Sequence, residues 1–413
     1  MIVNKPGDDS PSAPAKHLAS PMRTQMLFVG VLIAAIAFLG GVWFTGRMDS
    51  PHNTDEFDLF WQSWAILEDE FYYELPPDRE LIYGAAQGLL AAAGDRYTFF
   101  APPQAAAYDR QTLAGEFGGI GAYVGQDADG QLVITALFSG FPAKEAGLLA
   151  QDVIEEIDGV PIAGWTLETA VGWLRGEIGS EVTLTVYRPA DGSRFTVEIT
   201  RARVELPTAI ADTYDGVGYV RLFTFNDRAT ELLEGEIETL IRQGVTGLIL
   251  DLRGNPGGLL DQAVSVSDLF LDEGVIVTQQ DRQGRRMTYR SQTGQIAEDV
   301  PLVVLIDGGS ASASEVVAGA LQDRGRAVLI GQASFGKGLV QYVHDLPGGS
   351  QVHVTAALWF TPNETPIQDQ GLAPDVVVED SAAEAGRDPF VDAALEYLAQ
   401  GAGVAEQEAQ TLE

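Results

Sequence analysis

Residues 204–378 alternate between short β-branched apolar runs and longer runs with apolar residues at helical spacing. This alternation constrains the fold more than any other feature, because it is typical of strands joined by helical crossovers. We therefore expect an α/β domain with a largely parallel sheet. The expected strands are residues 216–222, 247–254, 301–309 and 327–332, and the expected helices are residues 229–244, 259–271 and 312–325.

A serine and a lysine in small-residue surroundings follow at the ends of expected strands. Ser312 lies in GSASASE, where a strand gives way to a helix, and Lys337 lies in FGKG, past the next strand. Ligands gather at the carboxyl ends of parallel strands, so both residues are candidates for a site there. A neutral lysine can activate a serine hydroxyl. Near pH 7 this needs a lysine pKa roughly 3 units below its usual value of about 10.4, which burial can supply.

These motifs resemble those of the carboxy-terminal processing peptidases, serine proteases of peptidase family S41 that use a Ser–Lys dyad. The resemblance covers about residues 57–378 and includes GEFGGIGA, LILDLRGNPGG, GSASASE with FGKG, and TPIQDQGLAPDVVV. It implies a crotonase- or ClpP-like α/β core, with Ser312 as nucleophile, Lys337 as base and Gln341 as the residue that orients the lysine. The residues alone do not choose among the three serines of GSASASE.

An acyl-transfer reaction also needs two N–H donors at the developing oxyanion. The amide of Ala313, at an expected helix start, is one candidate. The second is expected in NPGG after the strand that ends at residue 254, because only glycine lets a backbone approach so closely. The family resemblance favours Gly258 over Gly257.

Residues 114–203 have a different character, with five short β-type runs and two helical stretches. Their order resembles a PDZ domain inserted before the α/β core. A glycine-rich turn can bind a terminal carboxylate, and the strand after it can accept an extended peptide. The resemblance implies that this domain selects apolar C-terminal tails and that Arg175 links peptide binding to the active site. The expected carboxylate-binding loop is Gly119, Ile120, Gly121 and Ala122.

The N-terminal quarter predicts a tail, an anchor and a small helical region. Residues 26–44 carry no charge over 19 positions, enough to cross a bilayer as a helix. The preceding segment 1–25 is rich in Pro, Ser, Ala and Asp, which predicts a disordered tail. Its basic residues predict that this tail is cytoplasmic and that the catalytic body lies outside the cytoplasm. A cleaved signal peptide is the alternative. Apolar residues at helical spacing in residues 57–113 predict a small helical unit with its own core.

Composition excludes several other classes. The net charge of −34 argues against nucleic-acid binding, and the absence of cysteine excludes disulfides and thiolate metal sites. Residues 331–337 fit the start of a phosphate-binding loop, but Gly338 replaces the hydroxyl residue that such loops need. A Ser-His-Asp hydrolase would need a G-x-S-x-G motif, which is absent. We expect neither a metal nor an organic cofactor.

The sequence thus predicts a single-pass serine endopeptidase of the cell membrane that acts on proteins with apolar C-termini. The alternative is a non-catalytic, membrane-tethered PDZ scaffold. The physiological substrate, a homo-oligomeric state and an adaptor protein stay open. The expected parts are a tail (1–25), an anchor (26–44), a helical region (57–113), a PDZ domain (114–203), a protease core (204–379) and an acidic tail with a short helix (380–413).

Overall fold

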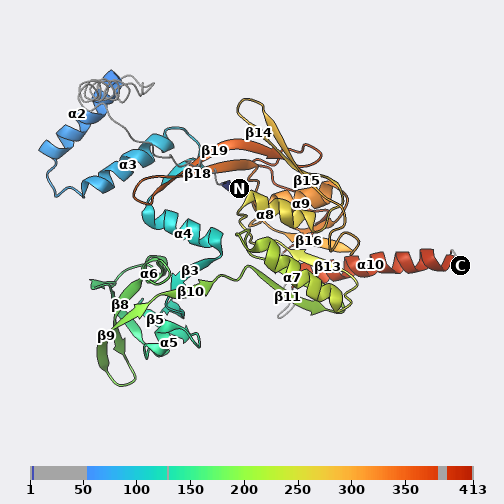
Figure 1. The fold of residues 1–413 in the computed structure, drawn as a ribbon, viewed down its shortest axis with the longest axis horizontal. Helices are drawn as coiled ribbons and strands as arrows, with labels where there is room; N and C mark the ends of the chain where they lie inside the picture. The colour runs from blue at the N-terminus through green and yellow to red at the C-terminus, as the bar shows by residue number, and fades with distance from the viewer. Residues whose placement is uncertain (1, 4–53, 128–129, 380–387, 412–413) are drawn as a thin grey trace, which may run out of the picture. The chain divides into compact units, whose positions relative to one another are not determined.

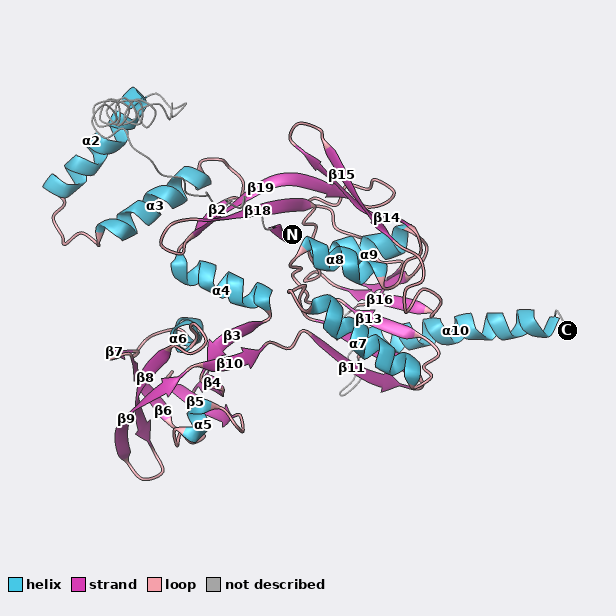
Figure 2. Cartoon of the chain, viewed as in Figure 1, coloured by secondary structure: helices cyan, strands magenta, loops and turns pink. Residues whose placement is uncertain are grey.

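The structure is a computed structural model that describes residues 2–3, 54–127, 130–379 and 388–411. The chain divides into two compact units, residues 6–85 and residues 1–5 with 86–413. Figure 1 shows the order of the elements along the chain, and Figure 2 distinguishes helices from strands.

The smaller unit contains helix α2 (Thr54–Glu70) and the start of α3 (Asp78–Ala91). Its large apolar side chains do not form the core that the sequence predicts. Phe57 and Trp61 are more than half exposed within the chain, and no residue of α3 is buried. The two short helices leave too little apolar area between them to exclude water from these aromatic rings.

The expected transmembrane helix requires a correction of the fold class. Among the residues that the structure describes, no helix is both long and apolar enough to cross a membrane. The apolar run 26–44, on which the expectation rested, lies outside the described residues, as does the tail 4–25.

The α/β core of the larger unit is built on a six-stranded sheet in the order β11-β12-β13-β16-β17-β20. All of its pairings are parallel except that of β11 with β12, in agreement with the alternation in the sequence. The strands are β11 (Ala209–Tyr214), β12 (Val217–Leu222), β13 (Leu248–Asp251), β16 (Leu302–Ile306), β17 (Val328–Gly331) and β20 (Val376–Val377).

Helices cover both faces of this sheet (Figure 2). Helices α7 (Ala229–Arg242), α8 (Leu260–Asp268) and α9 (Ala313–Asp323) pack on one face around residues such as Leu250 and Val304. The first turns of α10 (Pro389–Thr411) pack on the other face, against Ile249 and Leu305. Adjacent strand residues point to opposite faces, so nearly every position in β13 and β16 is buried, as in parallel sheets generally.

A second sheet begins just after the lysine candidate, since its strand β18 starts two residues beyond Lys337. Its order is β1-β18-β19-β14-β15, and β2 also pairs with β19. Helix α4 (Pro103–Ala114) connects β2 to the inserted domain. The strands are β1 (Ile2–Val3), β2 (Phe99–Ala101), β14 (Gly274–Asp281), β15 (Arg286–Ser291), β18 (Leu339–Asp345) and β19 (Gln351–Phe360).

The inserted domain has its own sheet and its own core, centred on Ile134 and Leu184. The sheet order is β4-β5-β6-β8-β9, with β7 paired to β6, and two helices, α5 (Pro142–Glu145) and α6 (Leu167–Leu174), accompany it. The chain enters through β3 (Glu116–Gly119) and leaves through β10 (Ala202–Glu205), which pair as an antiparallel stem. The strands are β4 (Ala122–Gln126), β5 (Leu132–Leu137), β6 (Val153–Ile157), β7 (Val160–Pro161), β8 (Glu181–Arg188) and β9 (Ser193–Thr200).

Candidate active site

Ser312 lies at the N-terminus of α9, directly after the turn that follows β16. It is buried and adopts a φ of +57°, a left-handed conformation that few residues other than glycine adopt. Such a backbone costs on the order of 1–3 kcal/mol and persists only where its surroundings hold it. The neighbouring Ala311 and Ala313 are buried, so the small residues of GSASASE let the turn fit inside the protein.

A buried carboxylate joins two segments: the turn of residues 310–312, called the serine turn, and the loop of residues 334–337, called the lysine loop. Glu315, in the first turn of α9, has no exposed surface. Its Oε2 accepts hydrogen bonds from the backbone N–H of Ser312 at 2.7 Å and of Lys337 at 2.9 Å. Its Oε1 accepts from Gly336 N–H at 2.7 Å and from the Ser334 hydroxyl at 2.6 Å. Four donors replace the water that an ionised carboxylate loses on burial, and they fix the two loops against each other.

The Lys337 side chain, from the loop before β18, is held by Gln341 of β18. Lys337 Nζ lies 2.6 Å from Gln341 Oε1, and Gln341 Nε2 donates to the Tyr97 carbonyl at 2.7 Å. The Tyr97 ring centroid is 5.1 Å from Nζ. The indole N–H of Trp359 donates to the Lys337 carbonyl at 3.0 Å, which fixes the backbone of the same residue.

Burial lowers the pKa of the Lys337 ammonium, while the nearby carboxylates of Glu315 and Asp95 act to raise it. Burial outweighs these charges, so the net shift is toward the neutral amine that a general base needs. Leu339 and Val340, which follow the lysine along the chain, are buried. Phe335, two residues before the lysine, is half exposed.

The segment around Asp95 and Tyr97 supports this arrangement from a distant part of the chain. The Asp95 carboxylate accepts from the Thr98 hydroxyl at 2.7 Å and the Thr355 hydroxyl at 2.5 Å, which ties the segment to β19. The sequence alone predicts no role for these residues or for Glu315. Glu315 stands within the conspicuous GSASASE motif, but only the tertiary structure shows that its carboxylate reaches the lysine loop.

The glycine loop after β13 lies against the serine turn. Gly257 has a φ of +100°, and a Cβ built there would lie 2.8 Å from Ser312 Cβ and 2.9 Å from Ala313 N. Gly258 follows with a φ of +147° and pairs with Phe225 as an isolated parallel bridge. The bridge uses the N–H of Leu259 and the carbonyl of Gly257, so it does not involve the Gly258 N–H. The Ala313 N–H lies in the first helical turn, where no intrahelical acceptor exists.

The inserted domain contains a pocket of about 330 Å³ at the expected carboxylate-binding loop. Gly119, Ile120, Gly121 and Ala122 line one end of it, and Phe138, Val171 and Leu174 supply apolar walls. Within the described residues β4 pairs only with β5, so its other edge faces the groove between β4 and α6. The site therefore combines a glycine turn, an apolar pocket and a strand edge.

Arg175 lines the same pocket at the end of α6. Its guanidinium lies over two aromatic rings, 4.1 Å from the centroid of Phe117 and 5.2 Å from that of Tyr108. Tyr108 belongs to α4, so this arginine contacts an element outside the inserted domain. Arg110, two residues further along α4, contacts Asp345 of β18 at 3.3 Å.

Comparison with known proteins decides the family. Residues 216–378 match the sequence profile of peptidase family S41, and residues 133–188 match that of the PDZ domain. A carboxy-terminal-processing protease of Bartonella bacilliformis is 39% identical over 318 residues, which cover 76% of this chain and 73% of that protein. This chain belongs to the carboxy-terminal processing peptidases. It is a serine-type peptidase with a PDZ domain, and the resemblance inferred from its motifs is confirmed.

Other relatives of the peptidase agree. A carboxyl-terminal-processing protease of a Picosynechococcus species is 38% identical over 323 residues, which cover 77% of this chain and 78% of that protein. Among solved structures, a photosystem II D1 C-terminal processing protease is 33% identical, with a TM-score of 0.47, covering 87% of this chain and 94% of that one. Since the Bartonella and Picosynechococcus relatives are named as proteases, the alternative of a non-catalytic scaffold is set aside.

Proposed function

We propose that the peptidase cleaves polypeptides with Ser312 as nucleophile and Lys337 as general base. The observation that carries the proposal is the partly buried Lys337 side chain. Gln341 holds its amine, and the Glu315 carboxylate binds the backbone N–H groups of both Lys337 and Ser312. A carboxylate that binds both backbones fixes the position of the base relative to the nucleophile, and it occupies neither side chain.

In this mechanism the neutral Lys337 amine takes the proton of the Ser312 hydroxyl as Oγ attacks the scissile carbonyl carbon. The N–H groups of Gly258 and Ala313 stabilise the oxyanion that forms. The lysine then passes its proton to the leaving amine, and the C–N bond breaks. A water molecule, deprotonated by the same lysine, hydrolyses the acyl-enzyme and restores the free serine.

The proposed substrates are proteins with apolar C-terminal tails, captured by the PDZ domain. The terminal carboxylate would meet the N–H groups of the 119–122 loop, and the last side chain would enter the pocket beside Val171 and Leu174. Arg175 contacts both this pocket and Tyr108 of α4, which supports its role as the link between tail binding and the catalytic sheet.

The proposal places the catalytic body outside the cytoplasm. This part is supported only by the charge bias of the N-terminal sequence, with Lys5, Lys16 and Arg23 before the apolar run. A reporter enzyme that is active only outside the cytoplasm, fused after residue 413, would be active. Activity of a reporter that works only in the cytoplasm would contradict the placement.

The decisive experiment compares wild type, Ser312→Ala and Lys337→Ala on an unstructured protein that ends in an apolar tail. The same protein ending in two aspartates is the matched substrate control. We expect both variants to lose cleavage and wild type to prefer the apolar tail. Cleavage by Lys337→Ala would contradict the dyad, whereas equal cleavage of the two tails would contradict the specificity alone.

A further inference from the structure

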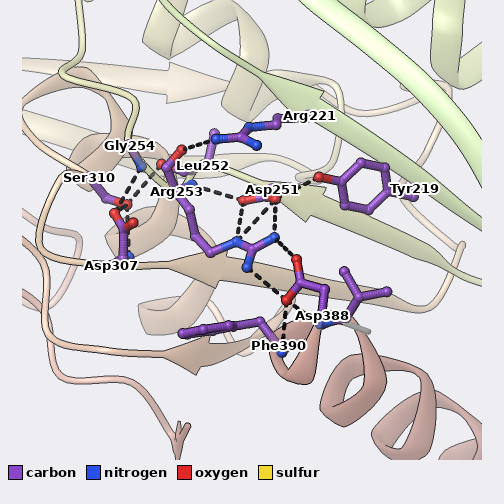
Figure 3. A network of polar contacts seen from close by, with 11 residues as sticks. Tyr219, Arg221, Asp251, Leu252, Arg253, Gly254, Asp307, Ser310, Asp388 and Phe390 are labelled. Carbon is purple, nitrogen blue, oxygen red and sulfur yellow. Dashed lines mark hydrogen bonds and ion pairs between the residues drawn. The ribbon is translucent and has the colours of Figure 1, made fainter. Parts of the chain in front are cut away.

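A network of polar contacts surrounds Arg253, which directly precedes the proposed oxyanion loop of residues 254–258 (Figure 3). Asp251, the last residue of β13, is fully buried. Its carboxylate accepts from the Tyr219 hydroxyl at 2.6 Å, from the Arg253 backbone N–H at 2.9 Å and from Arg253 Nη2 at 2.6 Å. Asp251 and Arg253 are two positions apart at the end of β13, so their ion pair turns the Arg253 side chain back toward this strand.

A second carboxylate holds the other side of the same guanidinium. Arg253 Nη1 donates to Asp388 Oδ1 at 3.0 Å, and Nη2 donates to Asp388 Oδ2 at 2.7 Å. The guanidinium carbon also lies 4.8 Å from the centroid of the Phe390 ring. Two parallel hydrogen bonds between arginine and a carboxylate fix direction as well as distance. The Arg253 side chain is 12% exposed and the Asp388 side chain is 42% exposed. This ion pair, called the clamp, therefore lies at the edge of the core.

Asp388 directly precedes the C-terminal helix α10, which starts at Pro389. Its Oδ1 also accepts from the Phe390 N–H at 3.0 Å, and its carbonyl accepts from the Asp392 N–H at 3.0 Å. Phe390 and Ala394 are buried on the face of the sheet that α10 covers. The Asp388 carboxylate is therefore held in place by a packed helix, and it can in turn fix the position of the Arg253 guanidinium.

The residues next to Arg253 are hydrogen-bonded to the serine turn. The Leu252 carbonyl accepts from the Ser310 hydroxyl at 2.8 Å, and Gly254 N–H donates to Asp307 at 2.8 Å. The Asn255 carbonyl accepts from Ala311 N–H at 3.0 Å and from the Ser314 hydroxyl at 2.9 Å. A displacement of the Arg253 backbone would thus reach the loop of residues 254–258 and the turn that presents Ser312.

We infer that Asp388 is a positioning residue for catalysis: from the start of α10 it holds Arg253, and thereby the 254–258 loop, against the serine turn. The inference rests on the proposed function, in which the Gly258 N–H stabilises the oxyanion. The C-terminal helix, which lies across the sheet from α9, would then support the active site and not only the core.

The test uses the full chain with Asp388→Asn, and with Glu396→Gln as the matched control. Asparagine keeps an oxygen that caps the helix about as well as aspartate, but it cannot form the charged clamp. Glu396 is an exposed carboxylate on the same helix. Because small misplacement of catalytic groups costs up to about 100-fold, we expect kcat of Asp388→Asn to fall roughly 10- to 100-fold. KM should stay within about twofold, since the Arg253–Asp388 ion pair does not touch the PDZ pocket. The melting temperature should stay near that of wild type, since asparagine keeps the oxygen that accepts from the Phe390 N–H.

Ser312→Ala, measured in parallel, separates the two hypotheses. If Ser312→Ala is inactive and Asp388→Asn retains wild-type kcat, the inference is overturned and the proposed function stands. If Ser312→Ala cleaves, the proposed function itself fails. An equal loss of kcat in Glu396→Gln also overturns the inference, because it would show a general effect of charge. Should Asp388→Asn melt well below wild type, Asp388→Glu decides, with restored kcat supporting the clamp and no restoration contradicting it.

Discussion

At the scale of single residues, the site is organised by a carboxylate that takes no part in the proposed chemistry. Glu315 is buried, and its carboxylate accepts hydrogen bonds from three backbone N–H groups and one hydroxyl. An apolar residue at this position would leave those donors unpaired, at a cost of roughly 1–3 kcal/mol each. The geometry between Ser312 and Lys337 therefore depends on a residue whose neighbours in sequence indicate only a helix start.

Replacement of Gln341 by glutamate tests the protonation state of Lys337. A carboxylate beside Nζ would favour the ammonium and raise a lysine pKa that burial now lowers. A raised pKa leaves less neutral base at pH 7, so we expect kcat/KM there to fall roughly 10- to 1000-fold, for a shift of about 1–3 units. The deficit should shrink as the pH rises, because both enzymes approach the neutral amine. The measurement is kcat/KM between pH 6 and pH 10.5.

Gln243→Glu, which makes the same chemical change at the exposed end of α7, is the control and should leave the profile unchanged. A loss in Gln341→Glu that is equal at every pH would mean that Gln341 acts through packing and not through the lysine pKa.

At the scale of elements, the loop between β13 and α8 decides whether the serine turn can form. Gly257 has a positive φ and no room for a side chain, with Ala311 O only 2.7 Å from a built Cβ. Gly257→Ala would push the loop away from Ser312. We expect kcat to fall about 100-fold or more, as when an oxyanion donor is removed, with KM little changed.

Gly216→Ala is the matched control, because Gly216 has a φ of +82° but open space around its Cβ. It should cost stability of about 1 kcal/mol through backbone strain and leave kcat intact. Similar losses of kcat in the two variants would contradict the close-approach argument, and thermal unfolding together with steady-state kinetics distinguishes these outcomes.

The sequence predicts these elements well where periodicity is strong. The run 229–244 corresponds to α7 (Ala229–Arg242), and 312–325 corresponds to α9 (Ala313–Asp323). It does not predict partners that are distant along the chain. The hydrogen bond between Tyr97 and Gln341 joins residues 244 positions apart, and no local pattern encodes such a contact.

At the scale of the whole molecule, the proposed sites of substrate capture and of catalysis lie in domains with separate hydrophobic cores. The PDZ domain has its own hydrophobic cluster and joins the protease through the β3–β10 stem. Val171→Asp would place a carboxylate in the apolar pocket, next to the proposed position of the substrate's own carboxylate. Loss of one apolar contact is worth roughly 10- to 100-fold. We expect KM for a protein with an apolar tail to rise by that factor, with kcat unchanged.

A short peptide without the tail should be cleaved equally by wild type and Val171→Asp, since it does not need the pocket. Val160→Asp, at an exposed position outside the pocket lining, is the control for added charge. An unchanged KM for the tailed protein would show that this pocket does not capture the tail.

The sequence by itself determined the alternation of strands and helices, the two modules and the catalytic candidates, because periodicity and short motifs are local properties of the chain. Only the tertiary structure decided how Glu315 joins the serine and lysine loops, how Tyr97 supports Gln341 and how Asp388 clamps Arg253. Each of these contacts joins separate elements. Their geometry depends on how the elements pack, and packing is set by the combined burial of many side chains and not by any one segment.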